Sequence, residues 1–174
     1  TIHEIRRLIA ALSPNVLDQY GLRAAVKQAV NRFRQHFPGA VEIAVQESHQ
    51  LPERLQTLIY RVLQECLTNI QKHSEASRVN ISLNTAEELL ELVVEDNGKG
   101  FNLDRALEKP DSFGLAGMKE RIGLYGGTVA IKSRTGRGTR VQVKLPLPQE
   151  NGTLNSGAAP GIDQELARVS DGFR

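Results

Sequence analysis

The sequence predicts one domain of mixed α/β class, and three observations support this prediction. The chain has 174 residues, which suits a single domain with a substantial core better than two domains. Apolar residues recur at helical spacing in two long segments and alternate at strand spacing in shorter ones. Most of the strand segments form pairs with short polar connections. Helices and hairpins are therefore expected to share one core.

The N-terminal part of the chain is predicted to be mainly helical. Residues 1–12 have a helical pattern without an N-terminal cap, which suggests that the chain begins within an element. A Ser-Pro-Asn sequence at 13–15 interrupts this pattern. A second amphipathic helix is expected over 17–37, ended by the Pro-Gly pair at 38–39. Residues 41–45 then alternate as a strand.

The middle of the chain contains the longest predicted helix. It begins near Pro52, a residue that suits the first turn, and runs to about His73 with a broad apolar face. Strands over 79–84 and 89–95 follow as a hairpin. The segment 97–113 is long and polar, which is typical of lids and binding loops.

The last part of the chain predicts a short helix over 114–125. Strands over 128–133 and 140–145 follow, joined by a glycine-containing turn. The composition changes from Pro146 onward, and residues 149–161 are rich in Gly, Asn, Ser and Pro. This stretch has little to bury and is expected to be a disordered tail or a linker.

Composition excludes several classes of protein. Charged residues make up 24% of the chain and the formal net charge is +2, so no electrostatic footprint for nucleic acid is present. No apolar run approaches the roughly 18 to 20 residues of a membrane span. The single cysteine, Cys66, lies within an apolar helical pattern as a small core residue. This part of the protein is expected to be soluble and cytoplasmic, without membrane contact of its own, an internal disulfide or structural zinc. Membrane anchoring of the parent protein stays open.

The most informative motif is the Asp-Asn-Gly-Lys-Gly sequence at 96–100, directly after the strand 89–95. At the end of a strand, Asp96 can accept a hydrogen bond from the amine of a ligand. Gly98 and Gly100 permit a sharp turn and a close approach to that ligand. The same residues suit an ordinary turn, so this motif alone leaves both a nucleotide site and a structural turn open.

The long helix carries a polar stripe opposite much of its apolar face. Glu65, Asn69, Lys72 and His73 share this stripe at helical spacing. An Asn amide oxygen suits Mg²⁺, a Lys can hold a phosphate, and a Glu can orient a group or accept a proton. A polar stripe is also normal on an amphipathic surface helix.

Two later segments also suit nucleotide binding. The Gly-Leu-Ala-Gly-Met sequence at 114–118 begins a helix, where free N–H groups and the helix dipole favour a phosphate chain. A flexible helix start explains the same glycines. The Gly-Arg-Gly-Thr sequence at 136–139 is most simply a hairpin turn, from which Thr139 could reach a base or its bound water.

Three motifs of the chain resemble, in content and in order, three sequence boxes of a known superfamily. The motifs are the helix with Glu65 and Asn69, the turn at 96–100 and the helix start at 114–118. The boxes are the asparagine box and two glycine boxes of gyrase, a heat-shock chaperone, sensor histidine kinases and mismatch-repair ATPases. The sequence is most similar to bacterial two-component sensor histidine kinases, of the subfamily that pairs with NarL-type response regulators bearing a helix-turn-helix output domain. Residues 65–74 resemble that subfamily's asparagine box, and residues 5–22 resemble its junction between dimerisation helices and catalytic domain.

The resemblance implies a two-layer α/β sandwich of the Bergerat type, with a mixed, mostly antiparallel sheet packed on helices. ATP would lie between the long helix and a lid. Asn69 would bind Mg²⁺ together with ATP phosphates and water, Asp96 would bind the adenine amine, and Glu65 would have an orienting or base role. The other residues expected to bind the nucleotide are Lys72, His73, Gly98, Gly100, Gly114, Leu115, Gly117, Met118 and Thr139.

The resemblance also implies an organisation and a function. Residues 1–13 would end a dimerisation helix, 14–147 would form the ATP-binding catalytic domain, and 148–174 would be a tail or linker. The domain would donate the γ-phosphoryl group to a histidine on a dimerisation helix absent from this chain, for onward transfer to an aspartate of a response regulator. Its partners would be its own dimerisation domain, in a homodimeric parent, and the regulator. His3 lacks the family's surrounding box, so self-phosphorylation of this chain alone is not expected.

Two alternatives remain open at this point. One is a serine kinase of the anti-sigma-factor type, which shares the nucleotide-binding fold but has no need of the junction segment. The other is a nucleotide-binding adaptor that has lost catalysis. The presence of Glu65, Asn69 and Asp96 together favours a catalytic domain.

Overall fold

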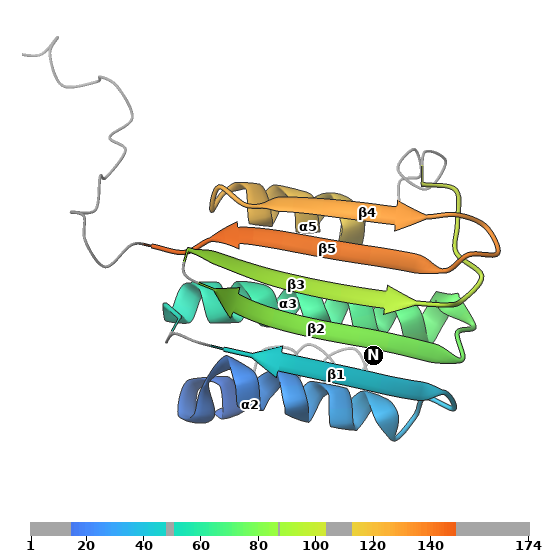
Figure 1. Cartoon of the computed structure of the whole chain (residues 1–174), viewed down its shortest axis with the longest axis horizontal. Helices are drawn as coiled ribbons and strands as arrows, with labels where there is room; N and C mark the ends of the chain where they lie inside the picture. The colour runs from blue at the N-terminus through green and yellow to red at the C-terminus, as the bar shows by residue number, and fades with distance from the viewer. Residues whose placement is uncertain (1–14, 48–50, 87, 104–112, 149–174) are drawn as a thin grey trace, which may run out of the picture.

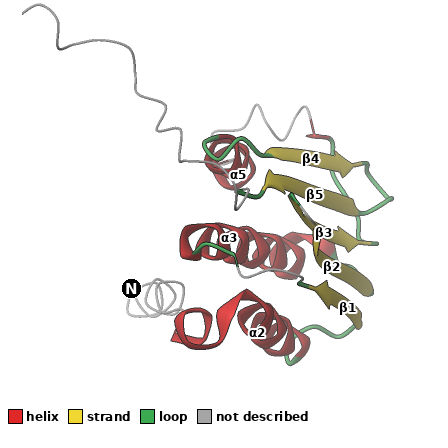
Figure 2. Ribbon diagram, turned by 60° about the vertical axis from the view of Figure 1, so that its left-hand side comes forward, coloured by secondary structure: helices red, strands yellow, loops and turns green. Residues whose placement is uncertain are grey.

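The fold consists of two layers, a sheet and the helices that cover one of its faces. The computed structural model describes residues 15–47, 51–86, 88–103 and 113–148. The helices lie on the same side of the sheet (Figure 1), and the turned view separates the two layers clearly (Figure 2). The predicted α/β sandwich is confirmed. The predicted junction at 1–13 and the tail from 149 onward lie outside the described residues.

The sheet has five strands in the order β1-β2-β3-β5-β4. They are β1 (Ala40–Gln46), β2 (Arg78–Ala86), β3 (Leu89–Asp96), β4 (Thr128–Ser133) and β5 (Thr139–Pro146). β1 pairs with β2 in parallel, and the other three pairs are antiparallel. Both predicted hairpins are therefore confirmed. The parallel pair needs a crossover connection, and the helix between the two strands, α3 (Glu53–Asn69), supplies it.

The described helical elements are α2 (Asn15–Arg34), α3 (Glu53–Asn69), the π-helix η1 (Ile70–Ser74) and α5 (Phe113–Gly123). The predicted end of α2 at residue 37 was wrong, because the helix stops at Arg34. Phe37 continues the apolar spacing for another reason: its ring stacks on Phe33 at a centroid distance of 4.8 Å. A break inside α2 was also missed, where Gly21 has a φ of 76°.

The predicted α-helix to His73 was wrong in its last turn. α3 ends as an α-helix at Asn69, and the chain continues as the single π turn of η1. Single π turns within helices are frequent at functional sites. This turn directly follows Glu65 and Asn69 and contains Lys72 and His73, the polar residues that the sequence singled out.

The core lies between α3 and the inner face of the sheet. α3 sits between α2 and α5 (Figure 2), and its side chains Ile59 and Leu63 are fully buried. β2 alternates exposed and buried residues along its whole length, as expected for a strand with one face in a core. Leu83, Leu92 and Val143 reach this core from three neighbouring strands.

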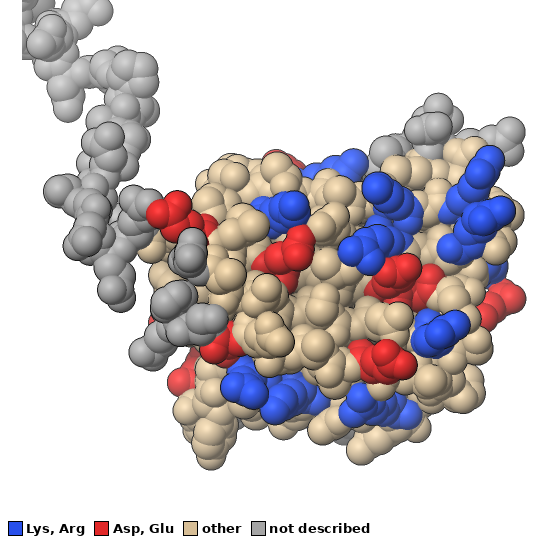
Figure 3. All heavy atoms as spheres, in the orientation of Figure 1, with Lys and Arg blue, Asp and Glu red and all other residues tan. Residues whose placement is uncertain are grey.

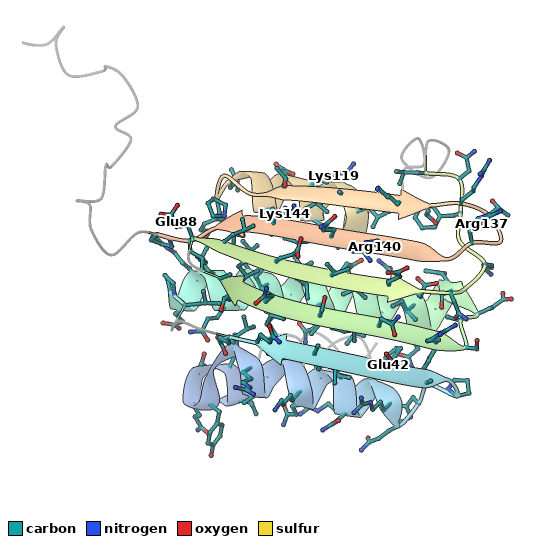
Figure 4. All side chains as sticks on the ribbon, viewed as in Figure 1. Glu42, Glu88, Lys119, Arg137, Arg140 and Lys144 are labelled. Carbon is teal, nitrogen blue, oxygen red and sulfur yellow. The ribbon has the colours of Figure 1, made fainter. Side chains whose placement is uncertain are left out.

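The other face of the sheet is polar and open. Lysines and arginines are interspersed there with acidic residues (Figure 3). Arg140 and Lys144 of β5 lie on this face (Figure 4), and Arg140 pairs with Glu95 across the strands at 2.5 Å. Exposed pairs of this kind add little stability, so burial on the helix side holds the layers together. Among the described residues, no helix combines the length and apolar character needed to cross a membrane.

Leu63→Ala tests the central place of α3. Leu63 is fully buried, so truncation is expected to lower the free energy of unfolding by about 2–5 kcal/mol. Urea denaturation at 25 °C measures the change. Leu124→Ala is the matched control, because Leu124 is 79% exposed, and its effect should stay within about 0.5 kcal/mol. Equal effects of the two substitutions would contradict the assignment of the core.

Candidate functional site

A cavity of about 570 Å³ opens on the helix side of the sheet. Its size falls within the range typical of sites for small molecules and cofactors. α3 and η1 form one wall, β3 and β5 form the floor, and the loop after β3 and the start of α5 complete the rim. The lining residues are Glu65, Cys66, Asn69, Ile70, His73, Ser74, Val94, Asp96, Lys99, Gly100, Phe101, Asn102, Gly114, Leu115, Thr139 and Val141.

The cavity brings together residues from all the motifs singled out in the sequence. The predicted site residues that line it are Glu65, Asn69, His73, Asp96, Gly100, Gly114, Leu115 and Thr139. Four others, Lys72, Gly98, Gly117 and Met118, do not line it. Met118 is fully buried in the hydrophobic core. Residues separated by up to 74 positions along the chain, from Glu65 to Thr139, thus share one cavity.

Asp96 is the buried acid of the cavity. It ends β3, is only 7% exposed, and its Oδ1 accepts the N–H of Gly98 at 2.8 Å. Burial raises the pKa of Asp96, while hydrogen bonds from the backbone N–H groups of Gly98 and Thr139 act in the opposite direction. A ligand amine that donates to the carboxylate would favour its ionised form in the same way.

The walls beside Asp96 are apolar. Val94 and Val141 come from neighbouring strands, and Ile70 and Cys66 come from the helix. Burial, reinforced by the charges of Glu65 and Asp96, raises the pKa of the Cys66 thiol to about 12. The thiol is therefore neutral and serves as a small apolar wall, so the prediction of a core cysteine is confirmed. Its place in the cavity was missed.

The π turn explains why His73 and Lys72 differ in position. The i→i+5 bonding of a π-helix widens the turn, so His73, four residues after Asn69, still faces the cavity. Lys72 is exposed outside it. The α-helical spacing used in the sequence prediction placed both residues on one face, because a change of helix type has no clear signal in the sequence.

Glu65 and Asn69 lie side by side on the α3 wall, which we call the Asn69 end of the cavity. The Asp96 loop, defined as residues 96–101, forms what we call its Asp96 end. The Asn69 amide Nδ2 donates to Glu65 Oε1 at 3.4 Å, which directs the amide oxygen away from Glu65. The Glu65 carboxylate also lies against Gly114, where any Cβ would overlap it. A side chain at residue 114 would therefore require the Glu65 carboxylate to move from its position beside Asn69.

The Asp96 loop passes between two other segments in tight backbone contact. On one side, the Lys99 N–H donates to the Ser74 carbonyl at 2.7 Å, and a Cβ on Gly98 would overlap that carbonyl. On the other side, the Gly136 N–H donates to the Lys99 carbonyl at 2.6 Å. A Cβ on Gly138 would overlap the Asp96 carbonyl. These glycines pack backbone against backbone, a role that the sequence prediction of a flexible turn did not include.

The β4–β5 turn contributes Thr139 to the cavity, as predicted, whereas the part of Ser133 was missed. Ser133 Oγ accepts the Phe101 N–H at 2.9 Å and lies 2.9 Å from Thr139 Oγ1. This cluster fixes Thr139 at the rim and joins the turn to the end of the Asp96 loop. Two glycines within a short polar turn were the available sequence signal, but they are equally typical of an ordinary hairpin.

Comparison with known proteins agrees with this fold and cavity. The family model of histidine kinase-, DNA gyrase B- and HSP90-like ATPases matches residues 54–149. This range contains the cavity residues of α3, the Asp96 loop, α5 and β5. The chain belongs to this family of ATPases. An ATP-binding domain is therefore the class of protein that the fold and the cavity define.

Its relatives include sensor histidine kinases of two-component signalling. The sensor histidine kinase LiaS of Bacillus subtilis (strain 168) is 36% identical over 151 residues, which cover 86% of this chain and 41% of LiaS. The signal transduction histidine-protein kinase/phosphatase DegS of Brevibacillus brevis is 33% identical over 151 residues, covering 86% of this chain and 39% of DegS. The chain thus spans about two fifths of the length of these curated relatives.

A solved structure agrees on the fold. The Acinetobacter baumannii histidine kinase AdeS matches with a TM-score of 0.61 at 20% identity, over 85% of this chain and 81% of that chain. At this identity the likeness concerns the fold alone. The domain is a histidine kinase-type ATPase domain in both sequence and architecture.

Gly138→Ala tests the close backbone contact, with Gly136→Ala as its matched control. Both glycines have positive φ, 71° and 77°, so each substitution is expected to cost about 1–2 kcal/mol from backbone strain. A Cβ at 136 meets nothing within 4 Å, whereas one at 138 overlaps the Asp96 carbonyl. Gly138→Ala should therefore lose at least about 3 kcal/mol of unfolding free energy in urea denaturation. Equal losses would show that the contact is not tight.

Proposed function

We propose that this domain binds Mg-ATP and acts as the catalytic domain of a sensor histidine kinase. It would donate the γ-phosphoryl group to a histidine on a dimerisation helix of the parent protein, for onward transfer to an aspartate of a response regulator. The observation that carries the proposal is the single cavity that joins Asp96, Asn69 and the first turn of α5. The Asp96 carboxylate can bind the amine of a base, the Asn69 amide oxygen can bind a metal ion, and the start of α5 can bind phosphates.

The Asp96 end of the cavity suits adenine. A flat base would lie against apolar lining residues such as Val94 and Ile70, with its exocyclic amine directed at the Asp96 carboxylate. Thr139 lies beside this position at the rim. The buried carboxylate favours a base that carries a hydrogen-bond donor at this position. A base with an acceptor there would leave the buried charge unpaired, which is costly.

The Asn69 end suits Mg²⁺ and phosphates. Mg²⁺ prefers oxygen ligands and keeps several waters, so one amide oxygen plus ligand phosphates meets its needs. No group of three or more His, Cys, Asp or Glu side chains in the described part of the chain could hold a metal ion, which fits an ion bound through the nucleotide. The N–H groups at the start of α5 add favourable partial charge for the phosphate chain. Lys72 and His73 remain proposed phosphate neighbours, His73 from the cavity wall.

The protein's part in the transfer would be positioning and charge neutralisation. Bound Mg²⁺ would supply neutralisation of the phosphate charge. Glu65 is assigned an orienting role, because its carboxylate holds the Asn69 amide at 3.4 Å. Gly98 and Gly100 let backbone segments approach closely beside the site, and Gly114 lies against the Glu65 carboxylate. Gly117 is proposed to shape the chain around the nucleotide. Leu115 contributes an apolar contact at the rim, and Met118 supports that turn from the core.

The parent protein is proposed to be a homodimeric sensor kinase with its catalytic part in the cytoplasm. Residues 1–13 would end its dimerisation helix and 14–147 would form the catalytic domain. The names of LiaS and DegS as histidine kinases support a response regulator as partner. A NarL-type regulator is proposed from the similarity of residues 5–22 and 65–74 to one kinase subfamily. Self-phosphorylation would require the dimerisation helices.

Titration with a fluorescent ATP analogue tests the nucleotide site. Wild-type protein is expected to bind saturably and more tightly with Mg²⁺. Asp96→Asn should weaken binding at least about tenfold, because a hydrogen bond to a buried charged group is lost. Asn69→Ala should remove most of the gain from Mg²⁺, whereas Asn84→Ala, on the open face of β2, should change nothing. Absence of saturable binding, or unchanged binding in Asp96→Asn, would contradict the proposal.

Phosphoryl transfer is tested with radiolabelled ATP. The domain is incubated either with a separately supplied dimerisation hairpin that carries the acceptor histidine, or with an anti-sigma antagonist protein. Acid-labile label on the hairpin alone is expected, because a phosphohistidine hydrolyses in acid. Acid-stable label on the antagonist would indicate a serine kinase instead. ATP binding without transfer, also in a longer form of the protein with its upstream helices, would indicate an adaptor.

A further inference from the structure

We infer that Ser74 is a positioning residue that couples the two ends of the nucleotide cavity. The inference rests on the proposed function and adds a residue to it. Ser74 ends η1, four residues after Ile70 and five after Asn69, and it also touches the Asp96 loop. It is one of few buried polar residues in the described part of the chain, with 7% of its surface exposed.

The Ser74 hydroxyl closes the π turn. Its Oγ donates to the Ile70 carbonyl at 2.8 Å and accepts the Ala76 N–H at 3.1 Å. A serine that bonds back to the carbonyl four residues earlier competes with regular helical bonding. The hydroxyl therefore supports the wider turn, which moves Lys72 away from the cavity and leaves His73 on its wall with Asn69.

The Ser74 carbonyl holds the other side of the cavity. It accepts the Lys99 N–H at 2.7 Å, and the absence of a side chain at Gly98 lets the Asp96 loop approach it. Two further contacts, at exposed positions, join the Asp96 loop to the residues that follow Ser74. Lys99 pairs with Glu75 at 2.6 Å, and the Asn97 side chain accepts the N–H groups of Ser77 and Arg78 at 3.0 and 2.8 Å.

One residue thus connects the helix of Asn69 with the loop of Asp96. The hydroxyl sets the shape of the helix end, and the carbonyl sets the distance to the loop. Each half of the site contains its own binding group, Asn69 or Asp96, so either half can bind its part of the ligand without the link. The link matters for a ligand that must touch both halves at once, because preorganisation removes the cost of aligning them.

Three ligands separate this role from a general structural one. Adenosine probes the Asp96 half, Mg-tripolyphosphate probes the Asn69 half, and Mg-ATP probes both, all by NMR titration well below the melting temperature. Ser74→Ala is expected to weaken Mg-ATP binding about tenfold, as for loss of a buried hydrogen bond, and to change the other two affinities less than about twofold. Ser77→Ala is the matched control, because it removes an exposed hydroxyl that bonds the same loop at 3.0 Å, and it should bind Mg-ATP normally.

A second measurement needs no variant and covers the case in which Ser74→Ala does not fold. If Ser74 couples the halves, adenosine should slow amide hydrogen exchange at Lys72 and His73, which lie away from the proposed adenine position. Mg-tripolyphosphate should slow exchange at Lys99, because coupling is reciprocal. Equal weakening of all three ligands, no weakening of Mg-ATP, or no cross-protection in the wild type would overturn the inference. Failure of the wild type to bind Mg-ATP would instead overturn the proposed function.

Discussion

The site depends on one constraint, the close passage of three backbone segments at the end of β3. The Asp96 loop lies between the end of η1 and the β4–β5 turn, with glycines at the points of closest approach. Gly98 and Gly138 are buried at these points, and buried backbone groups are nearly always paired within the protein. Direct backbone hydrogen bonds, donated by the Lys99 N–H to the Ser74 carbonyl and by the Gly136 N–H to the Lys99 carbonyl, meet this need. The position of the Asp96 carboxylate relative to α3 follows from them.

This constraint gives the two layers separate tasks. The sheet and α3 supply the buried apolar area that stabilises the domain, and the ends of the strands supply the chemistry. β3 delivers Asp96 and β5 delivers Thr139 from paired positions in the sheet register. The cavity is therefore fixed on its floor by the sheet and on its wall by α3. The charged open face of the sheet contributes to neither task directly.

Sequence patterns predicted most of the fold, because the governing signals are local. Strand alternation, proline and glycine boundaries and the apolar face of α3 depend on side chains within a few residues of one another. The order of the three motifs indicated which residues would meet, and Asp96, Asn69 and Gly114 do meet. What the sequence did not predict depends on distant partners or on backbone geometry. One example is the π turn, which separates His73 from Lys72. The parallel pairing of β1 with β2 and the close approach of Gly138 to the Asp96 carbonyl are two others.

The neutral thiol of Cys66 has a consequence for the chemistry of the cavity. With a pKa of about 12, only about one thiol in 10⁵ is ionised at neutral pH, and the thiolate is the form that oxidants and alkylating reagents attack. The wall beside Asp96 is thus protected from redox change as long as the cavity keeps its shape. A fluctuation that admitted water to Cys66 would lower the pKa of its thiol and would at the same time expose the sulfur to reagents. The rate at which the thiol is alkylated would then report how often the cavity wall at Cys66 opens to solvent.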